Sequence, residues 1–209
     1  MIKVLVVDHH PIVRKGIYSL FESSPEIQIV ATVDNGRELF EYVKKNPVDI
    51  VISEIDLPGL NGITALRTIK REHSDVKIII FSSHPEEVYA VSTIRAGASG
   101  YLPKTVDTHT IKEAILKVNS GGIYISNNLA QRLAFDETGN KPSKLYKKLS
   151  TREIEVLKLL SSGRKNKEIA HELEINEKTV STYKSRLLKK LNVTNIVDLI
   201  NQARHLEIG

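Results

Sequence analysis

Five short apolar runs divide the first half of the chain, and segments with the periodicity of amphipathic helices lie between them. The runs have strand length and are rich in β-branched residues; they span 2–8, 27–33, 48–54, 76–82 and 98–102. The helical patterns span about 11–23, 36–46, 62–72, 86–96 and 106–120. Strands that alternate with helices pair in parallel and are covered on both faces. The alternation therefore predicts a (βα)5 domain of the α/β class.

Polar side chains stand where several of these apolar runs end. Asp8, Glu54 and Ser82 end the first, third and fourth runs, and Lys104 follows the fifth. Right-handed crossovers bring the carboxyl ends of parallel strands to one crevice, which is where open α/β sheets keep their sites. We therefore expect an acidic pocket that holds a lysine and a hydroxyl.

The last part of the chain has a different pattern, with helices only. Ser150 and Glu153 have the spacing of a capping box, and the helix that follows is expected to end at Gly163. Further helical patterns span 166–173, 178–191 and 194–206. The second and third are joined by a tight turn, as in a helix-turn-helix, so we predict an all-α C-terminal domain of four helices.

Charge separates the two parts of the chain. Residues 1–140 hold 15 Lys and Arg against 17 Asp and Glu, a net charge of −2, whereas residues 141–209 hold 15 against 8, a net charge of +7. A basic end behind an acidic front indicates that only the C-terminal part meets a polyanion, although a solvated basic face without a partner remains the simpler alternative. We expect this polyanion to be double-stranded DNA.

Composition excludes several classes of protein. The chain has no cysteine, which excludes disulfides, thiolate zinc sites and cysteine nucleophiles. No apolar run approaches the roughly 20 residues that cross a bilayer, and no signal peptide pattern opens the chain. We therefore expect a cytoplasmic protein without a membrane partner.

The second helix of the helix-turn-helix carries a polar, basic face. Val180, Leu187 and Leu191 recur on its other face and are expected to pack inward. Short polar side chains suit base edges, and cations suit phosphates. The candidate DNA-binding residues are Lys165, Asn166, Lys167, Lys178, Thr179, Ser181, Thr182, Lys184, Ser185 and Arg186.

Several motifs resemble those of two-component response regulators of the NarL/FixJ family. The segments VLVVDHHPIVRKGI, DIVISEIDLPGLNG and IRAGASGYLPK are similar to the receiver pattern, and about 45 positions from Leu149 resemble the LuxR-type helix-turn-helix. The phrases KTVSTYKSRL and IDLPGLNG look most like the EvgA, BvgA and FimZ branch. The resemblance implies a flavodoxin-like receiver at 1–121, a linker at 122–146 and a DNA-binding domain at 147–209.

The resemblance also implies roles for individual residues. Glu54 stands where the family has the aspartate that a sensor histidine kinase phosphorylates, and Ser82, Tyr101 and Lys104 match the switch residues around it. A homodimer on promoter half-sites and a sensor kinase are the implied partners. A structural ion pair of Lys104 with Asp8 and Glu54, and plain packing of Tyr101, are the alternatives to switching roles.

Two positions depart from the receiver pattern. Glutamate replaces the acceptor aspartate at position 54, and His9 replaces one of two adjacent acids. In the family, such acids hold Mg²⁺ together with a backbone carbonyl, which is that of Asp56 here; imidazole is a poorer ligand for this ion. We expect weak magnesium binding at Asp8, Glu54 and Asp56, and no required cofactor.

A glutamate at the acceptor position leads us to expect activity that is partly constitutive or independent of phosphorylation. Natural divergence and a phosphomimetic substitution would both place a glutamate at position 54. We expect a transcriptional regulator and not an enzyme. The alternatives are a regulator that acts only through protein partners, and a small magnesium-dependent phosphoryl-transfer enzyme.

Overall fold

The structure is a computed structural model that describes residues 1–58, 62–127, 129–131 and 149–205. Two compact units divide the chain, one built around a β-sheet and one around the C-terminal helices. Most of the expected linker at 122–146, and the residues 206–209 expected in the C-terminal domain, lie outside the described ranges.

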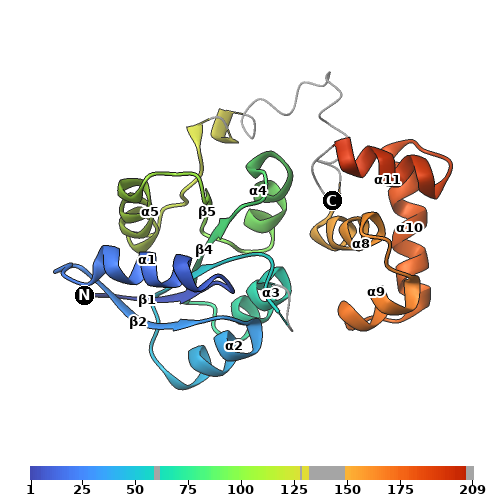
Figure 1. Cartoon of the computed structure of the whole chain (residues 1–209). Helices are drawn as coiled ribbons and strands as arrows, with labels where there is room; N and C mark the ends of the chain where they lie inside the picture. Colours follow the sequence, from blue (N-terminus) through green and yellow to red (C-terminus); the bar gives the residue numbers. More distant parts are fainter. Residues whose placement is uncertain (59–61, 128, 132–148, 206–209) are drawn as a thin grey trace. The chain divides into compact units, whose positions relative to one another are not determined.

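The first unit contains a sheet of five parallel strands (Figure 1). The strands are β1 (Ile2–Val7), β2 (Ile27–Val33), β3 (Ile50–Ser53), β4 (Lys77–Ser82) and β5 (Gly100–Pro103). Their order in the sheet is β2-β1-β3-β4-β5, the order of flavodoxin-like folds. The predicted (βα)5 class is thus confirmed. The third strand is shorter than its apolar run, so that Glu54 lies one residue beyond the end of the strand.

Five helices connect and follow these strands. They are α1 (Pro11–Phe21), α2 (Gly36–Lys45), α3 (Gly62–Glu72), α4 (Glu86–Arg95) and α5 (Thr108–Asn119). Local signals explain several starts: Pro11 occupies the first turn of α1, the Asn35 side chain accepts from Glu38 N at 2.9 Å, and Asp107 accepts from Thr110 N at 3.0 Å. Helices α1 and α5 cover one face of the sheet, and α2, α3 and α4 cover the other (Figure 1).

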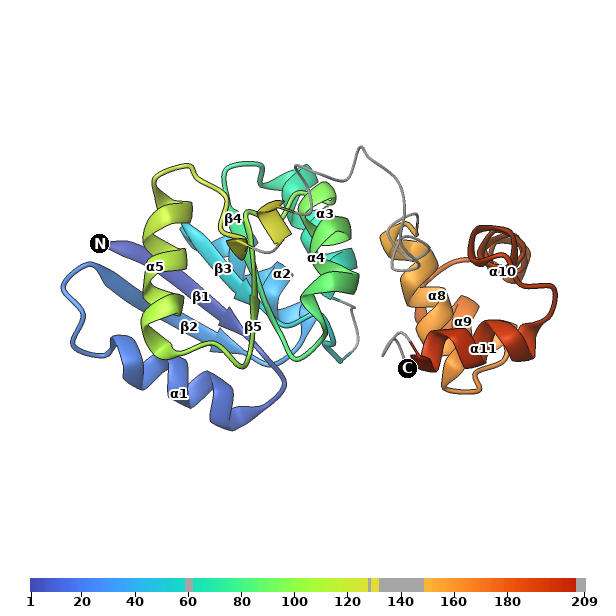
Figure 2. The ribbon, with the colours of Figure 1, turned by 90° about the horizontal axis from the view of Figure 1, so that it is seen from above.

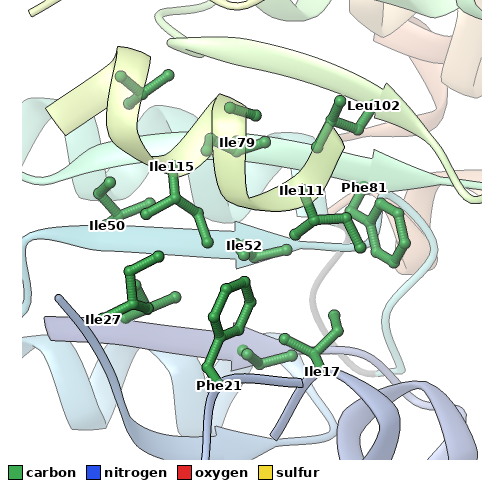
Figure 3. Close-up of a cluster of buried hydrophobic side chains, with 14 residues drawn as sticks. Ile17, Phe21, Ile27, Ile50, Ile52, Ile79, Phe81, Leu102, Ile111 and Ile115 are labelled. Atoms are coloured by element: carbon green, nitrogen blue, oxygen red, sulfur yellow. The ribbon is translucent and has the colours of Figure 1, made fainter. Parts of the chain in front are cut away.

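The core lies mainly between the sheet and the helices α1 and α5, as Figure 3 shows. Ile52 and Ile79 lie in the central strands and are at most 1% exposed. Phe21 of α1 and Ile115 of α5 pack onto them from the same side. Because apolar side chains cover both faces of β3 and β4, these strands form a rigid base for the groups at their carboxyl ends.

The segment after α5 returns to the sheet. Tyr124 N donates to Ser99 O at 2.9 Å, and Tyr101 N donates to Tyr124 O at 3.0 Å. A Cβ added at Gly100 would come within 3.0 Å of the Tyr124 carbonyl oxygen, so this close approach requires glycine. The first residues of the expected linker are therefore hydrogen-bonded to the first unit.

The second unit consists of α8 (Thr151–Ser161), α9 (Asn166–Glu172), α10 (Glu177–Leu191) and α11 (Ile196–His205). Helix α10 packs against both α8 and α9 (Figure 2). The predicted capping box is present: Glu153 N donates to Ser150 Oγ at 3.3 Å, and Ser150 N donates to Glu153 Oε2 at 2.6 Å. Gly163 follows α8 with a φ of +82°, which a glycine adopts without strain. The predicted four-helix C-terminal fold is confirmed.

Val180, Leu187 and Leu191 form the buried side of α10, as the sequence predicts. Within the described ranges, none of the helices is long and apolar enough to cross a membrane.

Candidate functional site

The carboxyl edge of the sheet brings together side chains that are far apart in the sequence. Backbone pairing positions them: Glu54 N donates to Val7 O at 2.9 Å, and Lys104 N donates to Ser82 O at 2.8 Å. Asp8, Glu54 and Ser82 are each at most 3% exposed. The parallel strands thus form one buried polar pocket, and its charged groups must compensate one another because water does not reach them.

Both carboxylate oxygens of Glu54 have partners. Oε1 accepts from the Ser82 hydroxyl at 2.5 Å and from the backbone N–H of Ile55 at 2.5 Å. Oε2 lies 2.6 Å from Lys104 Nζ. The glutamate is therefore held in one orientation by a hydroxyl, an amide and an ammonium, which are the donor types that would hold the oxygens of a phosphoryl group.

Lys104 joins the two acids of the pocket. Its Nζ lies 2.6 Å from Asp8 Oδ2 as well as 2.6 Å from Glu54 Oε2; the angles fall outside those of good hydrogen bonds, but both separations are those of ion pairs. Burial by itself lowers the pKa of Lys104, but the contacts with Asp8 and Glu54 outweigh it and hold that pKa above its ordinary value of 10.5. The lysine therefore stays charged at neutral pH.

Tyr101 points inward and connects the pocket to the start of the β4–α4 loop. The ring is 1% exposed, and its hydroxyl donates to the carbonyl of His84 at 2.8 Å. His84 Nε2 in turn lies 2.7 Å from Asp56 Oδ2. The tyrosine, the loop and the acidic turn after β3 are thus linked through one histidine.

The geometry does not suit magnesium. The expected set was Asp8, Glu54 and the backbone carbonyl of Asp56, but Lys104 holds one carboxylate oxygen of each of the two acids. Mg²⁺ requires near-octahedral oxygen ligands, and His9 adds none. A dication that used these two oxygens would have to displace the Lys104 ammonium.

Two histidines follow Asp8 directly. Asp8 Oδ1 accepts from His10 N at 2.8 Å and lies 3.0 Å from His10 Nδ1. The rings of His9 and His10 are tilted against each other with centroids 3.8 Å apart. Arg14 Nη1 donates to the Asp8 carbonyl at 2.5 Å. The turn between β1 and α1 therefore gathers imidazoles beside a carboxylate.

The outer face of α10 presents the hydroxyls and several of the cations that the sequence singled out. Ser181, Thr182 and Ser185 are exposed, and each hydroxyl donates to the carbonyl four residues earlier, at 3.0, 3.0 and 3.1 Å. Since their protons are used within the helix, these oxygens face outward chiefly as acceptors. Thr179 lies at the helix start instead, where its hydroxyl donates to Asn176 Oδ1 at 2.9 Å.

Two polar side chains connect α9 and α10. Asn166 Nδ2 donates to Ser181 Oγ at 3.3 Å, and Lys184 Nζ donates to Asn166 Oδ1 at 3.3 Å. These bonds set the position of α9 relative to the outer face of α10. Asn166 and Lys184 therefore have a role within the domain, and their contact with DNA stays a prediction.

Four exposed cations lie near this face without an acidic partner among the residues that the structure describes. They are Lys165, Lys167, Lys178 and Arg186. Arg186 also lies over the Tyr183 ring, 5.9 Å from its centroid. Unpaired cations beside hydroxyl acceptors form a surface that suits a polyanion.

Three residues make contacts in or near these sites that the sequence did not predict. His84 and His10 were not singled out, although each lies two residues after a predicted pocket residue. The sequence indicated no partner for Lys190, whose Nζ lies 2.7 Å from Glu153 Oε2, and the Glu153 side chain is only 2% exposed. No local pattern signals this contact, since the partners are 37 residues apart.

The two units of the chain match two known protein families. Residues 4–116 match the response regulator receiver domain family, and residues 147–203 match the luxR family of bacterial regulatory proteins. Fimbriae Z protein of Escherichia coli (strain K12) is 38% identical over 205 residues, which cover 98% of this chain and 97% of that protein. Response regulator UvrY of the same strain is 35% identical over 207 residues, which cover 98% and 95%.

A solved structure covers both units as well. RcsB from Salmonella enterica serovar Typhimurium, bound to promoter rprA in the presence of the phosphomimetic BeF3⁻, matches with a TM-score of 0.78 and 25% identity over 96% of each chain. The family matches cover the receiver and the helix-turn-helix, and the relatives cover nearly the whole length. The chain therefore belongs to the two-component response regulators that join a receiver domain to a LuxR-type DNA-binding domain.

Proposed function

We propose that this response regulator is a DNA-binding transcriptional regulator whose receiver is held partly in its active arrangement by Glu54, without phosphorylation. One observation carries the proposal: Glu54 binds the Ser82 hydroxyl and the Lys104 ammonium at once, with Tyr101 turned inward beside them. The carboxylate thus engages the groups that the family resemblance assigns to the phosphorylated state.

The size and charge of glutamate explain why the effect is partial. Relative to aspartate, the extra methylene carries the carboxylate about 1.5 Å further into the space of a phosphoryl group. A phosphorylated side chain carries a charge of about −1.5 to −2 and three acceptor oxygens, whereas glutamate offers one charge and two oxygens. A bias of about 1.4 kcal/mol toward one of two states already changes their ratio about tenfold.

We assign DNA recognition to α9 and α10. Helix α10 lies in the major groove, where Ser181, Thr182 and Ser185 face base edges and Lys178 and Arg186 contact phosphates. Hydroxyls that act as acceptors favour the amino groups of adenine and cytosine. The RcsB structures support this assignment, because they are described as bound to promoter DNA.

A homodimer is the form that we expect on DNA, with two half-sites about one helical turn apart. One of the similar structures is described as two RcsB dimers bound to two parallel DNAs, which supports this arrangement. The receiver at 1–121, the linker at 122–146 and the DNA-binding domain at 147–209 are the divisions that we propose. We place the protein in the cytoplasm, with a sensor histidine kinase as a further partner class.

The test is chemical modification of the receiver. The full chain and its Glu54→Asp variant are incubated with acetyl phosphate and Mg²⁺, and the intact mass is measured. We expect no phosphoryl adduct on the chain with Glu54, because a glutamate fills the acceptor position. A stable adduct on this chain would overturn the proposal.

The Glu54→Asp variant distinguishes two causes. An adduct on this variant alone shows that only the acceptor residue prevents phosphorylation. No adduct on either chain assigns part of the effect to His9 and to the contact of Lys104 with Asp8, since both alter the acidic set of the pocket.

A further inference from the structure

A second cluster of ligand atoms lies beside the receiver pocket, in the turn from β1 to α1. Asp8, His9 and His10 each offer one ligand atom, and these three atoms lie within 4.8 Å of one another. In the family, this turn contributes acids for a hard cation. Here two of three consecutive side chains are imidazoles, so that the chemistry of the turn has changed.

We propose that Asp8, His9 and His10 bind a first-row transition-metal dication such as Zn²⁺. Two imidazoles and one carboxylate form a borderline donor set that suits Zn²⁺ and its neighbours, whereas Mg²⁺ prefers oxygen ligands alone. Three protein ligands plus water form the usual open site of Zn²⁺. The proposal concerns this cluster and does not depend on the role of Glu54.

An unsatisfied nitrogen supports the proposal. Nδ1 of His9 is buried and has no hydrogen-bond partner among the residues that the structure describes. A buried polar atom without a partner carries a desolvation cost, and such atoms are few in native proteins. A metal ion bound through this nitrogen would give it the partner that the described residues do not supply.

The two carboxylate oxygens of Asp8 contact different partners. Oδ2 pairs with Lys104 at 2.6 Å, while Oδ1 faces His10, with 3.0 Å between Oδ1 and Nδ1. An oxygen and a nitrogen at this separation can share a metal ion after a small widening, because zinc–ligand distances are about 2.0–2.2 Å. Coordination through Oδ1 leaves the Lys104 ion pair of the receiver pocket in place.

The cluster is accessible from solvent. The His10 side chain is 51% exposed, and His9 lines a surface depression together with Asp34, Asn35, Arg37 and Pro58. A metal ion can therefore enter, and water can complete its coordination. Lys104 and Arg14 both contact Asp8, and their positive charges make the site weaker than a structural zinc site with four protein ligands.

The test uses the full chain without an affinity tag. Zn²⁺ binding is measured by isothermal titration calorimetry, and Co²⁺ binding by its visible absorption. The variants are His9→Gln and His10→Gln. The matched control is His109→Gln, because His109 is also an exposed histidine near a carboxylate, with Nδ1 3.4 Å from Glu113 Oε1.

We expect one metal ion per chain in the unsubstituted protein and in the control. Each of the two cluster variants should bind at least about tenfold more weakly, because a ligand of the metal is lost. Circular dichroism checks that the variants are folded, and His10→Gln is the safer of the two because this side chain is the more exposed. Unchanged binding in both cluster variants, an equal loss in the control, or no binding by the unsubstituted chain would refute the site.

Discussion

The charged side chains of the receiver pocket are paired within the protein, whereas several on the outer face of α10 are not. In the pocket, the buried carboxylates of Asp8 and Glu54 each pair with the partly buried Lys104 at 2.6 Å. On α10, Lys178 and Arg186 are exposed and have no acidic partner within the described ranges. Charges that pair inside the protein favour one conformation, whereas exposed cations without partners remain available to an external anion.

This difference predicts how each region responds to salt and to mutation. Buried pairs are little screened, and the loss of one partner leaves the other charge without compensation. Exposed cations contribute little to folding, but they release counterions when they bind phosphates. Substitutions in the pocket should therefore change stability and state, and substitutions on α10 should change DNA affinity.

The largest effect is expected from Lys104→Met. The variant leaves the carboxylates of Asp8 and Glu54 buried without their cation, which should cost about 3–5 kcal/mol in the free energy of unfolding. Urea denaturation measures this loss. Lys45→Met is the control, because that lysine pairs with Glu41 on the surface of α2 and should change stability very little. If Lys104→Met and Lys45→Met lower the free energy of unfolding equally, the paired charges of the pocket are no more important for stability than a surface ion pair.

On the outer face of α10, we expect the double substitution Lys178→Ala with Arg186→Ala to weaken binding to DNA of any sequence. The loss of two phosphate contacts should reduce the slope of log affinity against log salt by about 2. Fluorescence anisotropy with a promoter fragment at several salt concentrations measures the slope. Lys15→Ala with Lys44→Ala is the control, since it removes two exposed cations of the receiver. If the two double variants have the same slope, α10 is not the face that contacts DNA.

Glu54→Gln tests whether the pocket influences the DNA-binding face. Glutamine keeps the size of the side chain but removes the charge that Lys104 pairs with. We expect self-association and DNA affinity to fall by up to about tenfold, which corresponds to about 1.4 kcal/mol of bias between two states. Sedimentation velocity and anisotropy provide the two readouts. No change in either would show that the charge of Glu54 does not set the active state.

The smallest effect is a pH dependence inside the DNA-binding domain. Burial raises the pKa of Glu153, but the contacts with Lys190 and Ser150 outweigh it and hold that pKa below its ordinary value of 4.5. A depressed folded pKa stabilises the domain above pH 4.5, and the contribution disappears as the pH falls through the folded value. The protection factors of amides in α8 and α10, which are corrected for the intrinsic pH dependence of exchange, should therefore fall below pH 4.5.

Lys190→Met provides the check on this pH effect. The variant should already have lower protection factors at pH 6, and these should change less between pH 6 and pH 3, because the main partner of the carboxylate is absent. An acid response identical to that of the unsubstituted chain would contradict the assignment to this pair.

Much of the receiver site was predictable because local patterns mark it. Asp8, Glu54 and Ser82 each follow an apolar run, and parallel pairing requires that such ends meet at one edge of the sheet. The role of His84 was not predictable, because its contact with Asp56 joins residues 28 positions apart and depends on the course of the β4–α4 loop. The contact of Thr179 with DNA stays a prediction; the sequence did not indicate that its hydroxyl also bonds to Asn176 at the start of α10.

The helices and strands, their order, and the separation of charge between the two parts of the chain can all be read from the amino-acid pattern. Hydrophobic periodicity and capping residues act over a few positions, so they can be read without the fold. Only the tertiary structure decided which partner each buried charge has: Lys104 joins Asp8 to Glu54, and Lys190 reaches Glu153. Such pairs depend on distances of a few ångströms between distant segments, and only packing sets these distances.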